Sequence, residues 1–272
     1  MNRLFLAATS TLVALLLPGC LQNETTVTLN KDGSGTLVEQ TTLGGQMLSM
    51  LEQFAAFGGQ QGADPVAKLF SAEKAKEKAG KLGEGVTFEK SEPLTVGGGK
   101  GAKMTYRFTD INKLKVSPGS DMSDLSPMAG APGAPPKVEQ KPVTFNYAGG
   151  TLTVTMPDPQ KPAADPPKPD GAPDLSQMGA QEQAAMKEMM GDMKMSFKLV
   201  IEPGISETDA THRDGKTITL MEMEMGKLLE KPDTLEKLSK LDQNNPAAAM
   251  EAFKGINGVK METKKIVTVK VD

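Results

Sequence analysis

The sequence has no tryptophan, one cysteine and one histidine among 272 residues, and aromatic residues make up only 4% of it. One cysteine cannot form an internal disulfide, and so few rings argue against a cleft that stacks sugars on aromatic faces. The formal net charge is −3 without a basic block, so nucleic acid is not an expected partner, since phosphate binding relies on clustered lysine and arginine. The motifs G-x-S-x-G, H-E-x-x-H and G-x-x-x-x-G-K-[ST] are also missing. These absences predict a protein that is not an enzyme.

The first twenty residues carry the clearest signal. A weakly positive start is followed by an apolar run over 4–17, which is too short to span a bilayer but fits a secretory leader. The run ends in Leu17-Pro18-Gly19-Cys20, which resembles the lipobox of bacterial lipoproteins. The resemblance implies cleavage between Gly19 and Cys20 and a covalent lipid on Cys20. It explains a lone cysteine in an exported chain, and two or three acyl chains make a stable anchor.

The leader and the first hairpin together resemble a loose group of bacterial envelope lipoproteins. The segments concerned are the hairpin over 25–43, with its NKDGSG turn, and the stretch from GEGVTF to Asp110-Ile111. The group includes the mycobacterial LppM-like type, which carries a compact α+β domain without an assigned activity. The resemblance implies an exported protein held to a membrane by its lipid. Leu21 replaces the aspartate that commonly retains such proteins in the inner membrane, which implies an outer membrane facing the periplasm if the organism has two membranes.

Repeated strand and turn patterns predict the fold. Val27 and Leu29 alternate with polar residues, and Asp32-Gly33 is a strong hairpin turn. Similar strand, turn and strand patterns recur over 86–111, 143–156 and 195–225, and a last strand pattern covers 259–271. Frequent turns between β-branched runs predict an antiparallel sheet built from hairpins. We therefore expect residues 25–272 to form a single α+β domain, preceded by a signal peptide over 1–19 and an acylated tether over 20–24.

Helical signals are fewer and lie apart from the strands. Residues 46–57 place apolar side chains at helical spacing, and residues 65–82 form a charged helical pattern in which Ser71 is a candidate cap. Asp233 and Pro246 are typical of the starts of two further helices. Met47, Met50, Phe54 and Phe57 on the first helix are expected to pack in the core, with contact to a lipid or protein ligand as the alternative.

Two segments rich in proline, alanine and glycine, 117–142 and 157–191, are predicted to be disordered insertions. They flank a hairpin, so both should leave the domain from the same side. Each contains the pattern Asp-Leu-Ser-x-Met, formed by Asp124, Leu125, Ser126 and Met128 and by Asp174, Leu175, Ser176 and Met178. The pair is a candidate bivalent docking peptide, and chance in a biased composition is the alternative.

Methionine is abundant, with 18 residues. Five of them lie in one run: Met186, Met189, Met190, Met193 and Met195. Thioethers are soft ligands that suit Cu(I), so the run is a candidate metal site. Flexible apolar filling of a core is the alternative, and it is also the expectation for Met221, Met223 and Met225, which alternate along one strand.

These observations favour a membrane-anchored envelope lipoprotein that acts as a non-catalytic binding or scaffold protein. Its expected partners are the membrane, through the lipid on Cys20, and a protein or lipid of the envelope. Two alternatives stay open: a methionine-rich periplasmic Cu(I)-binding protein, and an envelope hydrolase with an unrecognised carboxylate site, for which Asp110 is one candidate.

Overall fold

A computed structural model describes residues 21–57, 64–118, 141–157, 191–230 and 255–272. Thirteen strands make up about half of these residues. Their bounds are β1 Leu21–Leu29, β2 Gly35–Leu43, β3 Val86–Val96, β4 Gly99–Phe108, β5 Lys115–Val116, β6 Val143–Ala148, β7 Thr151–Thr155, β8 Lys194–Ile201, β9 Ile205–Thr208, β10 Arg213–Asp214, β11 Thr217–Glu224, β12 Val259–Met261 and β13 Ile266–Val271. The helices in the described residues are α1 Gly45–Phe57, α2 Pro65–Leu69, α3 Ala72–Leu82, η1 Ile111–Lys113 and α6 Met225–Leu228.

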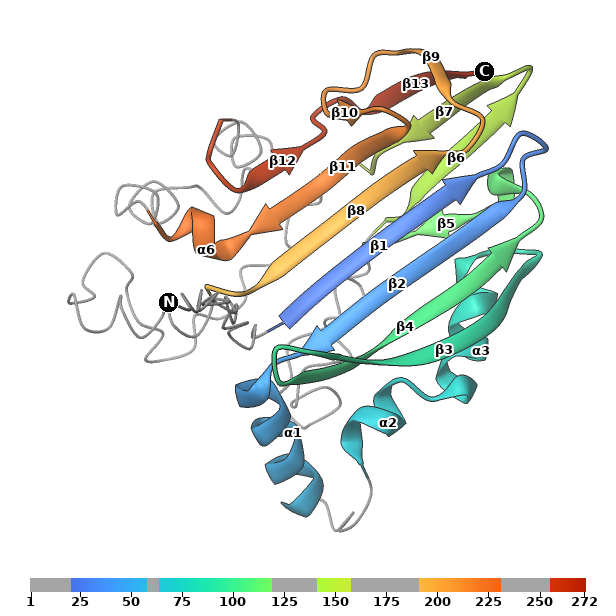
Figure 1. The fold of residues 1–272 in the computed structure, drawn as a ribbon. Coiled ribbons are helices and arrows are strands. Elements are labelled where there is room, and N and C mark those ends of the chain that lie inside the picture. The colour runs from blue at the N-terminus through green and yellow to red at the C-terminus, as the bar shows by residue number, and fades with distance from the viewer. Residues whose placement is uncertain (1–20, 58–63, 119–140, 158–190, 231–254) are drawn as a thin grey trace, which may run out of the picture.

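The larger sheet has eight strands in the order β10-β11-β8-β1-β2-β4-β3, with β12 beside β11 (Figure 1). The first hairpin forms as its sequence predicts. Gly33 takes a φ of 87° in the turn, and Oδ1 of Asp32 accepts hydrogen bonds from N and Oγ of Ser34. Side chains along β1 alternate between buried and half-buried, so one face of the sheet meets the core and the other carries polar side chains.

The smaller sheet has five strands in the order β5-β6-β7-β13-β9. The predicted antiparallel sheet is confirmed in its coarser part, since most pairs are antiparallel, but the strands form two sheets rather than one. The chain leaves the larger sheet at Pro203-Gly204, because β9 pairs with β13 rather than folding back on β8. The strand predicted at the C-terminus likewise divides, with β12 in the larger sheet and β13 in the smaller one. The fold is α+β in the broad sense that the turns and helical patterns predict.

A parallel pair lies at the centre of the larger sheet. Strands β1 and β8 run side by side from Gln22↔Lys194 to Leu29↔Ile201, although more than 160 residues separate them along the chain. A parallel pair needs a long connection rather than a tight turn, so no local turn signal could have predicted it.

The helices differ from expectation in one respect. The pattern over 65–82 is two helices, because Phe70 ends α2 and Ser71 caps α3 through a hydrogen bond from N of Lys74 to its Oγ. Helix α1 matches the prediction almost residue for residue. The helices predicted from Asp233 and Pro246 lie outside the described residues. In the part of the chain that the structure describes, no helix has the length and hydrophobicity needed to cross a membrane.

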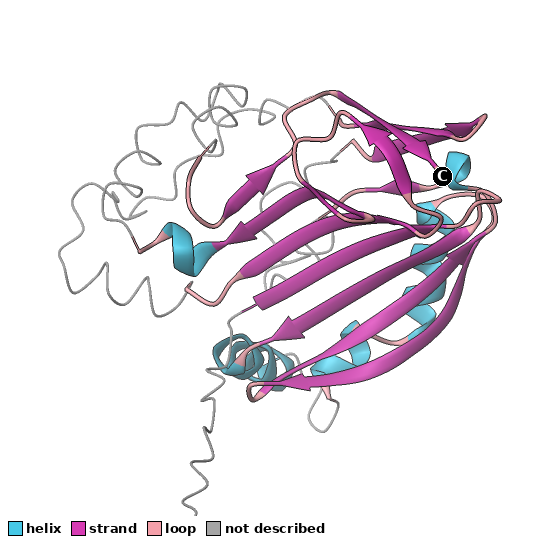
Figure 2. Ribbon diagram, turned by 45° about the horizontal axis from the view of Figure 1, so that its top comes forward, coloured by secondary structure: helices cyan, strands magenta, loops and turns pink. Residues whose placement is uncertain are grey.

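One hydrophobic core joins the two sheets and α3. It contains Leu29, Leu37 and Phe108 from the larger sheet, Val154 from the smaller sheet and Ala79 from α3. Figures 1 and 2 place the smaller sheet at the end of the larger sheet that is opposite α1. The smaller sheet therefore does not cover the end of the larger sheet near α1.

Candidate functional site

The first feature is the end of the larger sheet at which β1 begins, which we call the Leu21 end. Leu21 pairs with Leu43, and the neighbouring strands end or begin there at Lys194 of β8, Val96 of β3 and Glu224 of β11. The acylated tether expected over 20–24 is wrong for its described part, because residues 21–24 lie in β1, where they pair with β2 throughout and with β8 from Gln22 onward. Cys20 and Gly19, the predicted lipidation and cleavage residues, lie just outside the described residues.

A small hydrophobic cluster closes the core face at the Leu21 end. Its buried members are Leu21, Leu43, Leu48 of α1 and Val66 of α2. Leu21 is 3% exposed, so a residue directly after the candidate lipidation site is part of the packed domain. The position of Leu21 thus has a packing cause that does not depend on protein sorting.

A polar layer separates this cluster from the main core. Asn23 Nδ2 donates a buried hydrogen bond of 2.9 Å to Thr41 Oγ1. Lys78 Nζ from α3 lies 2.7 and 2.6 Å from the two carboxylate oxygens of Glu39, whose side chain is nearly buried. Moving α3 away from the sheet would separate two charges that are mostly shielded from water, which is costly. The Glu39–Lys78 ion pair therefore fixes the position of α3 over the sheet.

The opposite face of the larger sheet, which we call the open face, has no described element in front of it in Figure 1. It is formed by alternate residues of the central strands, such as Thr26 on β1 and Val38 on β2, which pair with each other. Ion pairs cross it from strand to strand. Lys198 Nζ lies 3.0 Å from Glu24 Oε2, which also accepts a hydrogen bond from Ser196 Oγ.

The pairing continues toward the edge of the sheet. Lys260 Nζ lies 2.8 Å from Glu222 Oε1, and its hydrogen bond holds the pKa of Glu222 below the ordinary value. Lys227 Nζ lies 2.7 Å from Glu224 Oε2, which lowers the pKa of Glu224 and raises that of Lys227. Opposite charges therefore alternate across this part of the open face, which suits a polar partner of mixed charge rather than a polyanion.

Two shallow grooves lie at the Leu21 end, one on each face of the larger sheet. The first, of about 310 Å³, lies between α2 and β3–β4 and is lined by apolar residues such as Val66, Phe70 and Pro93. The second, of about 200 Å³, lies on the open face, where Gln22 and Gln40 contribute to its lining. Neither groove could be predicted from local sequence patterns, because each forms between strands or helices that are distant in the chain.

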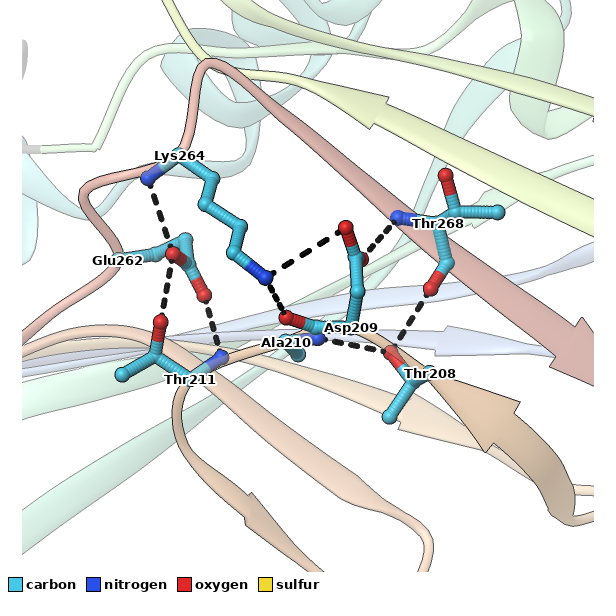
Figure 3. Close-up of polar contacts among 7 residues, drawn as sticks. All are labelled: Thr208, Asp209, Ala210, Thr211, Glu262, Lys264 and Thr268. Atoms are coloured by element: carbon cyan, nitrogen blue, oxygen red, sulfur yellow. Dashed lines mark hydrogen bonds and ion pairs between the residues drawn. The ribbon is translucent and has the colours of Figure 1, made fainter.

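A network of hydrogen bonds joins the two crossings between the sheets (Figure 3). Glu262, on the segment from β12 to β13, is 1% exposed, and its carboxylate accepts hydrogen bonds from N and Oγ1 of Thr211 and from N of Lys264 at 2.7, 2.8 and 3.0 Å. Burial acts to raise the pKa of Glu262, but these donors outweigh it, so the pKa lies below the ordinary value.

Asp209 forms the second half of this network. Its Oδ1 accepts a hydrogen bond of 2.7 Å from N of Thr268, which holds the pKa of Asp209 below its ordinary value with help from Lys264. Lys264 Nζ lies 3.5 Å from Asp209 Oδ2 and also donates to the carbonyl of Asp209. Because both carboxylates hold backbone N–H groups in place, we assign this network a structural role.

Asp110, the carboxylate considered for a hydrolase, also has a structural contact. Its Oδ1 accepts a hydrogen bond of 2.9 Å from N of Asn112 and caps η1. A carboxylate in this position satisfies a free N–H group at a helix start.

The methionines of the predicted run are only partly described. Met186, Met189 and Met190 lie outside the described residues, whereas Met193 packs against the small cluster and Met195 lies in β8. Met195 pairs directly with Met223 of β11, and Met221 pairs with Met261 of β12. All four are half-buried. The structure thus brings together methionines from separate segments, which sequence spacing could not show.

Met225 departs from its expected place. Strand β11 ends at Glu224, so Met225 begins α6 instead of continuing the row of Met221 and Met223. Its N–H donates a hydrogen bond of 2.9 Å to the carbonyl of Met193.

The two candidate docking motifs lie outside the described residues. They are formed by Asp124, Leu125, Ser126 and Met128 and by Asp174, Leu175, Ser176 and Met178. The described ends of their segments do lie together. Thr144 near the start of β6 pairs with Thr155 at the end of β7, so the chain enters and leaves this hairpin on one side.

Comparison with known proteins finds a distant likeness to one solved structure. No protein-family model and no curated protein matches the chain. Among solved structures, the chain is similar to the NMR structure of the folded domain of Mycobacterium tuberculosis LppM. The match has 8% sequence identity and a TM-score of 0.28, and it covers 77% of this chain and 85% of that one. The leader and first hairpin also resemble the LppM-like type, but a structural likeness so distant carries no argument about function.

Proposed function

We propose that this chain is an exported lipoprotein, acylated on Cys20, whose α+β domain is a non-catalytic binding module. The observation that carries the proposal is the start of β1 at Leu21, directly after a lipobox-like leader. Acylation would fix the domain by its central strand, with the open face exposed to a partner. Binding is favoured over hydrolysis because the carboxylates of Glu262, Asp209 and Asp110 each hold backbone N–H groups.

The partner in this proposal is a protein or lipid of the envelope that meets the open face. The face offers threonine hydroxyls and alternating charges over several strands, which suits polar recognition of moderate strength. An outer membrane facing the periplasm remains the proposed location for an organism with two membranes. Separation of the membranes on a density gradient would test it.

Site-directed photocrosslinking in intact membranes tests the binding surface. A photoreactive residue replaces Thr26 at the centre of the open face, and a matched one replaces Thr153 of β7 in the smaller sheet. One defined product from position 26 but not from position 153 is the expected result. Products from position 153 alone would contradict the proposed face.

A variant without both Asp-Leu-Ser-x-Met phrases separates the domain from its insertions. We expect the product from position 26 to persist in this variant. Its loss would transfer the binding role from the sheet to the two phrases.

A second candidate function is Cu(I) binding, which is supported by the pairing of Met195 with Met223 beside Met221 and Met261. Neighbouring positions on one sheet face bring thioethers close enough to share a soft ion. Competition with a Cu(I) chelator tests this candidate. The double variant Met195→Leu with Met223→Leu, which conserves core volume, should weaken competition, whereas equal competition by both proteins would remove these two residues as ligands.

A further inference from the structure

We propose that the Leu21 end of the larger sheet, together with α1, rests on the lipid bilayer, with the Met50 and Val96 side chains in its interfacial layer. This inference depends on the proposed acylation of Cys20 and deepens it by assigning the surface of the domain that meets the membrane.

The absence of a spacer is the first support. Leu21 follows Cys20 directly, and consecutive Cα atoms are about 3.8 Å apart. Leu21 is paired with Leu43 and buried in the small cluster, so it cannot move away from the sheet without breaking both contacts. A lipid on Cys20 therefore holds the whole Leu21 end close to the headgroups, including the start of α1, which follows β2 after a single residue.

The distribution of exposed apolar side chains is the second support. Among the residues whose side-chain exposure the structure describes, three large hydrophobic residues are exposed: Met50 at 41%, Val96 at 44% and Ile266 at 52%. Val96 adjoins the β3–β4 turn at the Leu21 end, and Met50 lies on α1, which packs there through Leu48. In Figure 1 this turn and α1 lie at the same corner as the start of β1. Ile266 belongs to the smaller sheet, away from this corner.

Charge indicates what kind of surface these side chains meet. Helix α1 carries Glu52 as its one charged residue and has no lysine or arginine. At the same end Lys194 and Lys227 are both paired with Glu224, and exposed Lys100 follows the β3–β4 turn. One lysine beside the turn adds only a weak attraction to anionic headgroups, so contact with the bilayer should come mainly from apolar insertion. A zwitterionic bilayer is then sufficient and salt has little effect.

The composition of the chain permits a direct test. The mature chain, beginning at Cys20, is coupled through that single thiol to a maleimide lipid in phosphatidylcholine vesicles. Because there is no native tryptophan, Met50→Trp, Val96→Trp and Ile266→Trp each report one position without background. Quenching by brominated lipids measures contact with the bilayer, and the Ile266→Trp protein is the matched control.

We expect blue-shifted emission and several-fold stronger quenching for Met50→Trp and Val96→Trp than for Ile266→Trp, with little change in high salt. Quenching absent from both, or equal in all three proteins, would overturn the inference. Tryptophan itself favours interfaces, so Met50→Asp is added to the Val96→Trp protein. Reduced quenching supports a contact made by α1, whereas unchanged quenching would remove α1 from the contact.

Chemical coupling keeps this test separate from the proposed function. It supplies the lipid whether or not cells acylate Cys20. An unmodified Cys20 in cells would refute the proposed function, whereas absent quenching on coupled vesicles would refute the membrane-facing surface alone.

Discussion

Replacing Glu262 by glutamine should destabilise the junction between the two sheets. The carboxylate is buried and accepts three hydrogen bonds from N and Oγ1 of Thr211 and from N of Lys264. Glutamine removes the charge and turns an NH₂ group toward some of these donors. In its better orientation the amide oxygen replaces Oε1 and keeps the bonds from Oγ1 of Thr211 and N of Lys264, whereas the NH₂ group faces N of Thr211. Hydrogen bonds to a charged group contribute about 1.5–3 kcal/mol each, so one lost bond and the loss of charge at the other two should together cost about 2–4 kcal/mol.

Urea denaturation of the mature chain with Cys20→Ala measures this loss as a lower midpoint at an unchanged slope. Glu207→Gln is the matched control, because that side chain is exposed on β9 and its ion pair with Lys270 should contribute under about 1 kcal/mol. A Glu262→Gln protein within about 0.5 kcal/mol of the parent would refute the reasoning.

The pH dependence gives an independent check. The folded pKa of Glu262 lies below its ordinary value of 4.5, so its carboxylate stabilises the fold above that value. This stability is lost as the pH falls below 4.5 through the folded pKa. The parent should therefore lose more stability than Glu262→Gln on acidification, and parallel curves would contradict the assigned hydrogen bonds.

Two further predictions concern packing at the Leu21 end and are measured by the same denaturation assay. Glu39→Ala should cost about 3–5 kcal/mol because it removes the carboxylate paired with the mostly buried Lys78, whereas Glu39→Leu with Lys78→Met should recover most of it. A small effect of Glu39→Ala would show that the pair is not formed. Gly101→Ala should cost about 3 kcal/mol or more, since the new Cβ would lie 1.8 Å from the carbonyl oxygen of Thr41. Gly80→Ala in α3, with nothing within 4 Å of its Cβ, should instead stabilise by about 0.5–1 kcal/mol, and equal effects of the two alanines would contradict this packing.

The hairpins could be predicted because their signals are local. Asp32-Gly33 and Gly97-Gly98 supply the positive φ angles of tight turns, and alternation on each side fixes which face is buried. Helix α1 and the cap at Ser71 could likewise be predicted, because short stretches of sequence carry their signals.

The division into two sheets could not be predicted, because it depends on pairing between distant segments. Pro203-Gly204 reads as an ordinary hairpin turn, yet it carries the chain from β8 to a strand of the other sheet. The tether failed for a related reason. Residues 21–24 are a short and mostly polar segment, so their sequence does not indicate a strand. Their pairing with β2 and β8 depends on the fold.

In the candidate site, too, local features could be predicted and contacts between distant segments could not. The lipobox pattern predicts lipidation at Cys20, but it does not indicate that β1 begins at the next residue. The pairing of Met195 with Met223 and the buried Glu39–Lys78 contact depend on register and helix placement, for which spacing in the chain gives no signal.

Mass spectrometry of the N-terminal peptide from the native membrane fraction is the decisive measurement for acylation of Cys20. Acylation requires a mature chain that begins at Cys20 and carries thioether-linked diacylglycerol there, and Cys20→Ala should move the protein to the soluble fraction. A chain found in the membrane with an unmodified Cys20, or with its leader still attached, would contradict it.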